Sequence, residues 1–158
     1  MDRVDKINYY LDIAKAVAER GTCLRANYGS VIVKDDEIIS TGYTGAPRGR
    51  KNCIDLGYCR RRESNMPSGM GYEFCRSVHS EQNAIISASR KDMLNATLYL
   101  VGVRKETGNY VTDNKPCTFC KRMLINAGIE KVVMRDTDSE YRVEYIKDWI
   151  EKDDTLDE

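Results

Sequence analysis

The sequence has almost no histidine, no net charge and no long apolar run. Lys and Arg number 25, as do Asp and Glu, so the formal net charge is zero. Proteins that coat nucleic acid carry excess positive charge, so we expect no nucleic-acid partner. No stretch approaches the roughly 18 consecutive apolar residues of a membrane-spanning helix, so we expect no membrane partner. Residues 1–6 lack the apolar stretch of a secretory signal, which predicts a cytoplasmic location.

What is present is the composition of a globular chain. Its 158 residues match about one domain and suffice to bury a core. Hydrophobic residues make up 41% and charged residues 32%, which is typical of a folded chain. No repeat or low-complexity segment divides the sequence, so we expect a single domain over residues 1–158 with an acidic tail at about 151–158.

Hydrophobic periodicity predicts helices and short strands in alternation. Helices are expected at residues 4–20, 79–90, 117–127 and 139–151. Strands are expected at residues 31–33, 38–39, 97–103, 110–111 and 131–134. Residues 44–71 are rich in Gly, Pro and Arg and are expected to form a long ordered loop. The alternation after residue 79 favours an α/β layer fold with helices covering a sheet.

The segment Pro116-Cys117-Thr118-Phe119-Cys120 is the first of two motifs that carry chemistry. Its two cysteines lie three positions apart at the expected start of a helix, where exposed N–H groups stabilise thiolates. Such a pair can bind a soft metal, but the same spacing occurs in thiol redox pairs and by chance. In a reducing compartment, cysteines are more often ligands or catalysts than disulfides.

The segment His79-Ser80-Glu81 is the second motif, and it contains the only histidine. A lone histidine is usually a hydrogen-bonded polar residue, but with Cys117 and Cys120 it completes three nitrogen and sulfur ligands. Three ligands and one open position are the pattern of a catalytic zinc. Glu81 can then move protons, or it is an ordinary acid at a helix start. The order H-x-E followed by P-C-x-x-C is the signature of zinc nucleobase deaminases.

Through these motifs the chain resembles the cytidine and deoxycytidylate deaminase superfamily, and most closely its deoxycytidylate (dCMP) deaminase branch. The resemblance covers roughly residues 4–135. Its matching segments are residues 29–34, 42–49, 79–84, 116–120 and 125–129. It implies an α/β fold of three layers, α/β/α, in which helices flank a mixed sheet of about five strands.

The resemblance also implies a reaction and a cofactor. Members hydrolyse the 4-amino group of dCMP to give dUMP and ammonia, in pyrimidine nucleotide salvage. It implies one catalytic Zn²⁺ bound by His79, Cys117 and Cys120, with Glu81 as the catalytic proton carrier. Many members are oligomers activated by dCTP and inhibited by dTTP, so a homo-oligomer (a hexamer or a dimer) with these effectors is expected.

Four residues are expected to bind the substrate. The backbone at Ser80, where the family usually has Ala, is expected at the base edge. Thr44 stands in the loop that resembles the family's sugar and phosphate loop, at a position usually occupied by Asn, which leaves the substrate preference open. Arg48 in that loop and Arg25 are expected to contact phosphate, because guanidinium groups bind phosphate bidentately. The run of arginines at 60–62 is expected to be solvated or to contact an effector or another subunit.

Four further cysteines, Cys23, Cys53, Cys59 and Cys75, have two interpretations. Some relatives carry a second, structural zinc near these places, and Cys23 and Cys53 match it best. Four cysteines would complete a closed tetrahedral site and would explain how a Gly- and Arg-rich loop stays ordered. The alternative is that they are small buried apolar residues.

Three other functions remain as alternatives to dCMP deamination. The first is deamination of another nucleoside, nucleotide or base. The second is a zinc-stabilised regulatory module without catalysis, and the third is a thiol redox protein. The span between the strand at 97–103 and Pro116 is longer than is usual in the family, and its hairpin is expected at the pocket rim or at a subunit contact.

Overall fold

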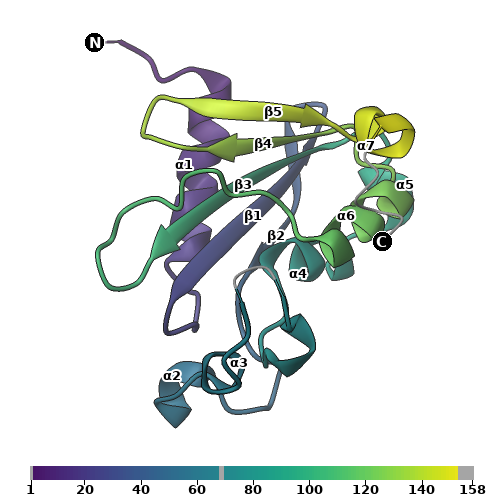
Figure 1. Cartoon of the computed structure of the whole chain (residues 1–158). Helices are drawn as coiled ribbons and strands as arrows, with labels where there is room; N and C mark the ends of the chain where they lie inside the picture. Colours follow the sequence, from purple (N-terminus) through teal and green to yellow (C-terminus); the bar gives the residue numbers. More distant parts are fainter. Residues whose placement is uncertain (1, 68–69, 153–158) are drawn as a thin grey trace.

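A five-stranded mixed sheet forms the centre of the computed structural model, which describes residues 2–67 and 70–152 (Figure 1). The strands are β1 (Ala26–Lys34), β2 (Glu37–Tyr43), β3 (Thr97–Arg104), β4 (Lys131–Arg135) and β5 (Tyr141–Tyr145). Their order is β2-β1-β3-β4-β5. Only β3 and β4 pair in parallel; the other neighbours are antiparallel. The strands predicted at residues 31–33, 38–39, 97–103 and 131–134 are confirmed, and β1 and β2 are longer than expected.

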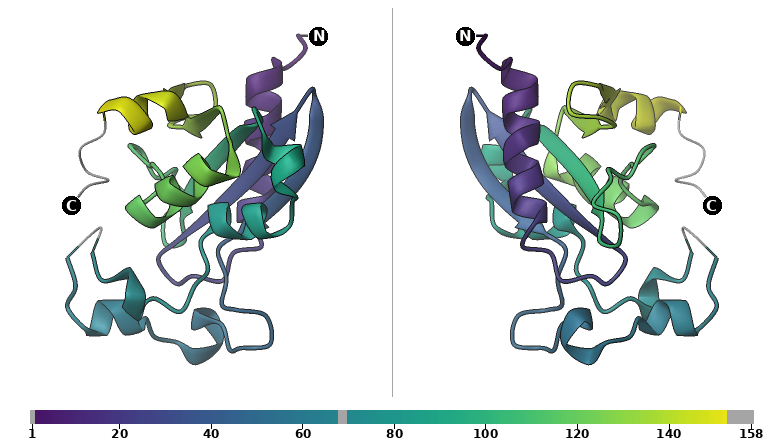
Figure 2. Two further views of the ribbon diagram at one scale, coloured as in Figure 1. Left: turned by 90° about the vertical axis from the view of Figure 1, so that its right-hand side faces the viewer. Right: turned by 90° about the vertical axis from the view of Figure 1, so that its left-hand side faces the viewer.

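Helices cover both faces of this sheet, which confirms the three-layer α/β/α fold. The helices that pack on it are α1 (Lys6–Ala18), α4 (Ser80–Ile86), α5 (Arg90–Met93), α6 (Thr118–Ala127) and α7 (Ile146–Lys152). Figure 2 shows α1 on one face and α4 and α6 on the other. One buried cluster joins Leu11 and Ala14 of α1 to β1 and β3. A second joins Ala84 and Leu124, from α4 and α6, to the opposite face.

Two glycines in neighbouring strands let the helices approach the sheet closely. A Cβ added at Gly29 would lie 2.1 Å from the Ala14 carbonyl oxygen of α1. A Cβ added at Gly42 would lie 2.3 Å from the Ser80 carbonyl oxygen of α4. Atoms cannot approach so closely, so these positions must lack a side chain. The N-terminus of α4 is thereby seated directly on the backbone of β2.

Residues 139–151 do not form the single helix that the sequence predicts. The structure has the strand β5 over Tyr141–Tyr145, followed by the helix α7 over Ile146–Lys152. Exposed and half-buried residues alternate along β5, which is the two-residue period of a strand at a sheet edge. The apolar spacing that predicted one helix therefore belongs to two elements. Most of the acidic tail, residues 153–158, lies outside the described residues.

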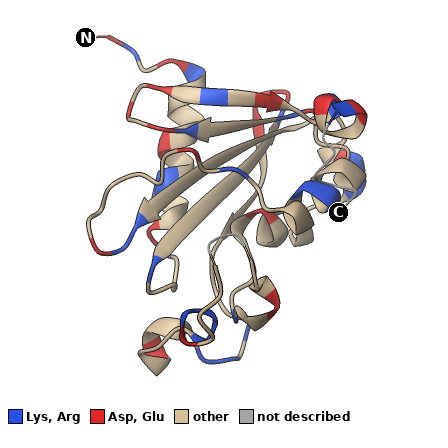
Figure 3. Ribbon diagram, in the orientation of Figure 1, with Lys and Arg blue, Asp and Glu red and all other residues tan. Residues whose placement is uncertain are grey.

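Two further expectations are corrected in part. The helix expected over 79–90 ends at Ile86, and α5 begins at Arg90 after the Ser89 hydroxyl accepts a hydrogen bond from the Asp92 N–H. The loop expected over 44–71 contains two one-turn helices, α2 (Cys53–Leu56) and α3 (Arg60–Glu63). Basic residues mark α3 and the loop beside it, and acidic residues mark the β4–β5 turn (Figure 3). Within the described residues, no helix is long and apolar enough to cross a membrane.

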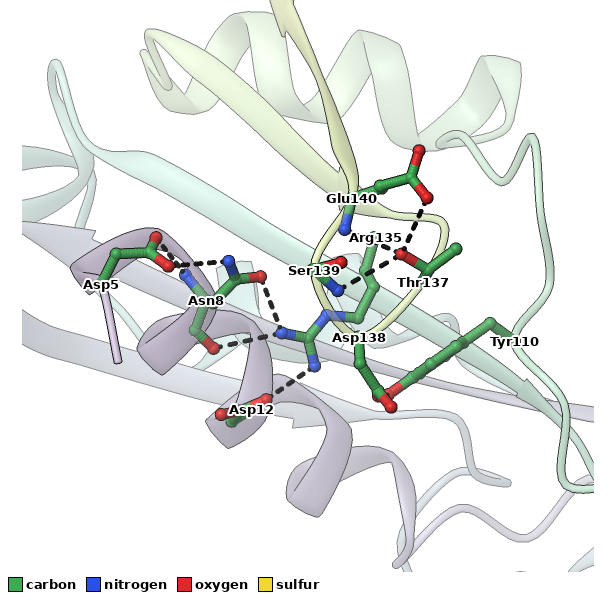
Figure 4. Close-up of polar contacts among 9 residues, drawn as sticks. All are labelled: Asp5, Asn8, Asp12, Tyr110, Arg135, Thr137, Asp138, Ser139 and Glu140. Atoms are coloured by element: carbon green, nitrogen blue, oxygen red, sulfur yellow. Dashed lines mark hydrogen bonds and ion pairs between the residues drawn. The ribbon is translucent and has the colours of Figure 1, made fainter. Parts of the chain in front are cut away.

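Tyr110 holds the segment after β3 to the face of the sheet that α1 covers. Tyr110 pairs with Val103 in an isolated β-bridge, so the strand expected at residues 110–111 is only a single bridge. Its hydroxyl group donates a hydrogen bond to Asp138, and its ring lies 5.8 Å from the guanidinium of Arg135. Arg135 is fully buried and contacts Asp12 at 2.8 Å and Asn8 at 3.0 Å, both on α1 (Figure 4). Tyr110 thus connects this segment to the folded core.

Candidate metal and catalytic centre

The N-termini of α4 and α6 meet, and their capping residues are two of the predicted ligands. His79 is the N-cap of α4, and its backbone N–H donates to the Gln82 side chain at 2.9 Å. Cys117 is the N-cap of α6, and Cys120 lies one turn into that helix. A histidine and two cysteines from segments nearly 40 residues apart are therefore brought together by two helix starts.

The three side chains have the spacing that a tetrahedral zinc ion requires. His79 Nδ1 lies 3.5 Å from Cys117 Sγ and 3.4 Å from Cys120 Sγ. Typical Zn–N and Zn–S bond lengths in a tetrahedron separate N and S by about 3.5 Å. This is the only group of three metal-ligating residues within the described ranges, 2–67 and 70–152, whose ligand atoms all lie within 4.8 Å. The donor set and its spacing both fit Zn²⁺.

The electrostatics of this group favour a thiolate at Cys117. Hydrogen bonds from Cys120 and His79 lower the pKa of Cys117, against the opposing effect of burial. The hydrogen bond with Cys117 likewise raises the pKa of His79. The hydrogen bond between Cys117 and Cys120, followed by burial, raises the pKa of Cys120. Of the two sulfur atoms, that of Cys117 is therefore the more easily ionised, and a metal ion binds cysteine as the thiolate.

Glu81 is buried beside these ligands, with 5% of its surface exposed. The Ser80 hydroxyl donates to Glu81 Oε1 at 2.7 Å, and the Ser80 and Ser30 hydroxyl oxygens are 2.8 Å apart. Burial, followed by the nearby negative charge of Glu81, raises the pKa of Tyr28 to about 12. Glu81 is therefore a buried carboxylate beside the predicted ligands and not an exposed acid at a helix start.

A pocket of about 390 Å³ opens over this centre. Glu81, His79 and Cys117 lie in its wall, with Ser80 and Thr44 beside them. Its cations are Arg25, Arg61, Arg104 and Lys115. Arg48, which the sequence predicts to contact phosphate, is exposed and does not line this pocket.

Sequence reasoning did not find Arg104, Lys115 and Tyr28, which also line the pocket. Arg104 ends β3, and Lys115 comes two residues before Cys117. Proximity to a predicted ligand was thus the available signal for Lys115, whereas Arg104 required the pairing of β3 with β1. The longer span between Arg104 and Pro116 lies at the pocket rim, because Val111, Thr112 and Lys115 also line the pocket.

Thr44 supports the pocket wall through the backbone of β1. Its side-chain oxygen accepts a hydrogen bond from the Tyr28 N–H at 3.0 Å, and the residue is buried. The Thr44 backbone N–H donates to the Tyr28 carbonyl oxygen at 3.2 Å. The hydroxyl group is therefore used to fix Tyr28 within the pocket wall.

Arg61 corrects the expectation for the arginine run. It is buried, and its guanidinium donates to the carbonyl oxygens of Met70 and Pro67 at 2.7 and 2.8 Å. It also lies 4.7 Å from the Tyr72 ring, which packs edge-on against His79 at 5.1 Å. Arg61 is thus a structural group that orders the loop next to the metal ligands, whereas Arg60 and Arg62 are exposed.

The four remaining cysteines come near one another without forming a closed cluster. Cys23, Cys59 and Cys75 line the pocket, and the Arg25 backbone N–H donates to Cys23 Sγ at 3.4 Å. Burial raises the pKa of Cys53, and the charges of the other three cysteines add to that rise. Among the residues with described coordinates, no three of these sulfur atoms lie within 4.8 Å of one another.

Comparison with known proteins gives concordant matches. A model of the cytidine and deoxycytidylate deaminase zinc-binding region matches residues 4–135. Deoxycytidylate deaminase from Mycobacterium phage D29 is 37% identical over 138 residues, which cover 84% of this chain and 96% of the relative. Deoxycytidylate deaminase from Schizosaccharomyces pombe is 33% identical over 127 residues, which cover 80% of this chain but only 35% of that longer protein.

A solved structure shares the fold. The dCMP deaminase from cyanophage S-TIM5, in complex with dCMP and dUMP, superimposes with a TM-score of 0.59 at 22% identity. The match covers 85% of this chain and 84% of the other.

Proposed function

Because this chain belongs to the family defined by the cytidine and deoxycytidylate deaminase zinc-binding region, we propose that it is a zinc-dependent hydrolase that converts dCMP to dUMP and ammonia. The observation that carries the proposal is the approach of His79, Cys117 and Cys120 beside the buried carboxylate of Glu81. The 37% identity to a phage deoxycytidylate deaminase supports dCMP as the substrate.

His79, Cys117 and Cys120 would hold the zinc ion, which when bound supplies Lewis-acid activation of the attacking water. Three protein ligands leave a fourth position open towards the pocket. Glu81 would take a proton from the attacking water and deliver it to N3 of the cytosine ring. It would then transfer a second proton to the departing amino group, so that water and dCMP yield dUMP and ammonia.

The pocket cations would recognise the substrate phosphate. Arg25, Arg104 and Lys115 are exposed residues that line the pocket. Arginine can bind a phosphate bidentately, and lysine adds a positive charge. Arg48 lies outside the pocket lining and would need another route to the substrate. The backbone at Ser80 would bind the base edge, and Thr44 would act by fixing Tyr28.

A matched substrate panel tests this function. Ammonia release is measured with cytidine, deoxycytidine, CMP, dCMP, dCTP and the adenine and guanine nucleotides. We expect a strong preference for dCMP, and repeating the panel with dCTP or dTTP tests the expected effectors. A preference for another member would retain the zinc chemistry and change the substrate. Silence across the panel from the zinc-loaded protein would favour a non-catalytic module.

A second zinc per chain is part of the proposal. It is supported by Cys23, Cys59 and Cys75 lining the same pocket and by their effect on the pKa of Cys53. Adjustment of the four side chains would close a tetrahedral site that also holds the loop after β2. Elemental analysis is expected to return two zinc ions per chain. One zinc ion would leave these four cysteines as small apolar residues that bind no metal, of which only Cys53 is buried.

We also propose that the chain works as one domain and as a homo-oligomer, with a cytoplasmic location. Size measurement by light scattering distinguishes a hexamer, a dimer and a monomer.

A further inference from the structure

Two buried hydroxyl groups connect the central sheet to the carboxylate of Glu81. Ser30 projects from β1 and Ser80 begins α4, and neither has any exposed surface. Their hydroxyl oxygens are 2.8 Å apart, and the Ser80 hydroxyl lies 2.7 Å from Glu81 Oε1. Ser30 is paired with Gly42, the residue whose missing side chain lets Ser80 reach the sheet.

The hydrogen bond to Glu81 fixes the direction of the second one. The Ser80 hydroxyl has a single proton, which it donates to Glu81 Oε1. The Ser80 oxygen is then free to accept, and the Ser30 hydroxyl donates to it. Donors aligned in this way polarise one another, which strengthens the bond that reaches the charged oxygen.

We infer that Ser30 and Ser80 form a positioning chain for Glu81, an inference that rests on the proposed deaminase function. The two hydroxyl groups hold Oε1 as a hydrogen-bond acceptor and leave Oε2 as the oxygen that exchanges protons with water and substrate. It also fixes the carboxylate relative to the sheet rather than only to the short helix α4. Ser80 therefore acts through its hydroxyl group, in addition to any contact of its backbone with the base.

Ser40 provides a matched control for the positioning chain of Ser30 and Ser80. It is a buried serine on β2, and its hydroxyl donates to the Ala84 carbonyl oxygen of α4 at 2.7 Å. Ser40→Ala and Ser30→Ala each remove one buried hydroxyl between the sheet and the same helix. Only Ser30 is linked to Glu81, so the pair separates loss of packing from loss of positioning.

The test measures kcat, KM for dCMP, zinc content and thermal stability in four variants of the full chain. Ser80→Ala is expected to lower kcat roughly tenfold, the effect of one hydrogen bond to a charged group. Ser30→Ala is expected to lower kcat about threefold, because it weakens the same bond indirectly. KM and zinc content stay within about twofold of the wild type, since neither the ligands nor the backbone changes. Ser40→Ala keeps the wild-type kcat.

The double variant Ser30→Ala/Ser80→Ala gives the sharpest result. Ser30 acts only through Ser80, so the double variant is expected to match Ser80→Ala in kcat. The inference is overturned if the two losses multiply, if Ser80→Ala keeps full kcat, or if Ser40→Ala loses as much kcat as Ser30→Ala. A wild type that deaminates nothing overturns the proposed function itself. An active wild type with an unaffected Ser80→Ala overturns only the positioning chain.

Discussion

The floor and the rim of the pocket are built in different ways. The floor consists of His79, Ser80, Glu81 and Cys117, which stand on two helix starts packed against the sheet, and Cys120 is buried one turn further along α6. The rim consists of Arg25, Arg104, Thr112 and Lys115, all of them exposed. Groups that break bonds need fixed geometry, which buried helix ends supply. Groups that select a charged substrate act over a longer range and tolerate an exposed position.

The largest expected effect comes from changing the floor at Glu81. Glu81→Gln keeps the size of the side chain but removes its ability to carry a proton, so turnover of dCMP should fall by about 10³-fold or more. Zinc content and thermal stability should match the wild type, because the ligands His79, Cys117 and Cys120 are untouched. Steady-state kinetics and elemental analysis check both statements. An active Glu81→Gln enzyme would contradict the proton-carrier role.

A smaller effect is expected at Tyr28, where floor and rim meet. Burial and the charge of Glu81 raise the pKa of Tyr28 to about 12 from an ordinary value of 10.0. The unfolded chain loses this proton near pH 10 and the folded chain near pH 12. The stabilisation is therefore complete below pH 10 and is lost as the pH rises to 12, a loss of about 2 to 3 kcal/mol in the free energy of unfolding.

Urea unfolding at pH 8 and pH 11 measures this dependence. Tyr28→Phe should unfold with a shallower loss of stability over this interval than the wild type. Tyr10→Phe is the control. It removes a second tyrosine whose pKa is raised to about 12, in this case by a hydrogen bond to Asp36, and Tyr10 does not line the pocket. Equal slopes in the wild type and Tyr28→Phe would show that Tyr28 titrates normally in the folded protein.

The smallest effect is expected at the rim. Arg104→Ala and Lys115→Ala should each raise KM for dCMP about tenfold, the loss of one charge-assisted contact to phosphate. KM for deoxycytidine, which has no phosphate, should not change. Lys105→Ala is the matched control, because Lys105 is an exposed cation next to Arg104 that does not line the pocket. Equal losses on both substrates would remove phosphate recognition from these residues.

The difference between the floor and the rim of the pocket also decides which residues could be predicted from the sequence. His79, Glu81, Cys117 and Cys120 lie in two short motifs, so residue type and spacing alone identified the group. The layers of the fold followed from periodicity and from the family resemblance. Residues 141–145 were assigned wrongly to a helix, because an edge strand with alternating exposure was hidden in a pattern that continues into α7.

Rim residues depend on contacts between distant segments, which no local pattern encodes. Arg104 lies at the pocket because the pairing of β3 with β1 places it opposite Ala26, which also lines the pocket. Arg61 was expected to be solvated within a run of three arginines, yet its guanidinium donates hydrogen bonds to carbonyl oxygens of a neighbouring loop. Arg48 stood in a matching loop, but the turn carries it outside the pocket lining.

The attachment of Tyr110 to Arg135 and Asp138 has a practical consequence for protein engineering. The segment from residue 105 to residue 114 is fastened at its middle to the core and contains none of the metal ligands. Residues 105–109 and 112–113 can therefore be exchanged as a cassette between relatives, while Tyr110 and the buried Val111 and Asn114 are kept. Such chimeras would show the donor's preference for one nucleotide over another and would retain the host's reaction chemistry.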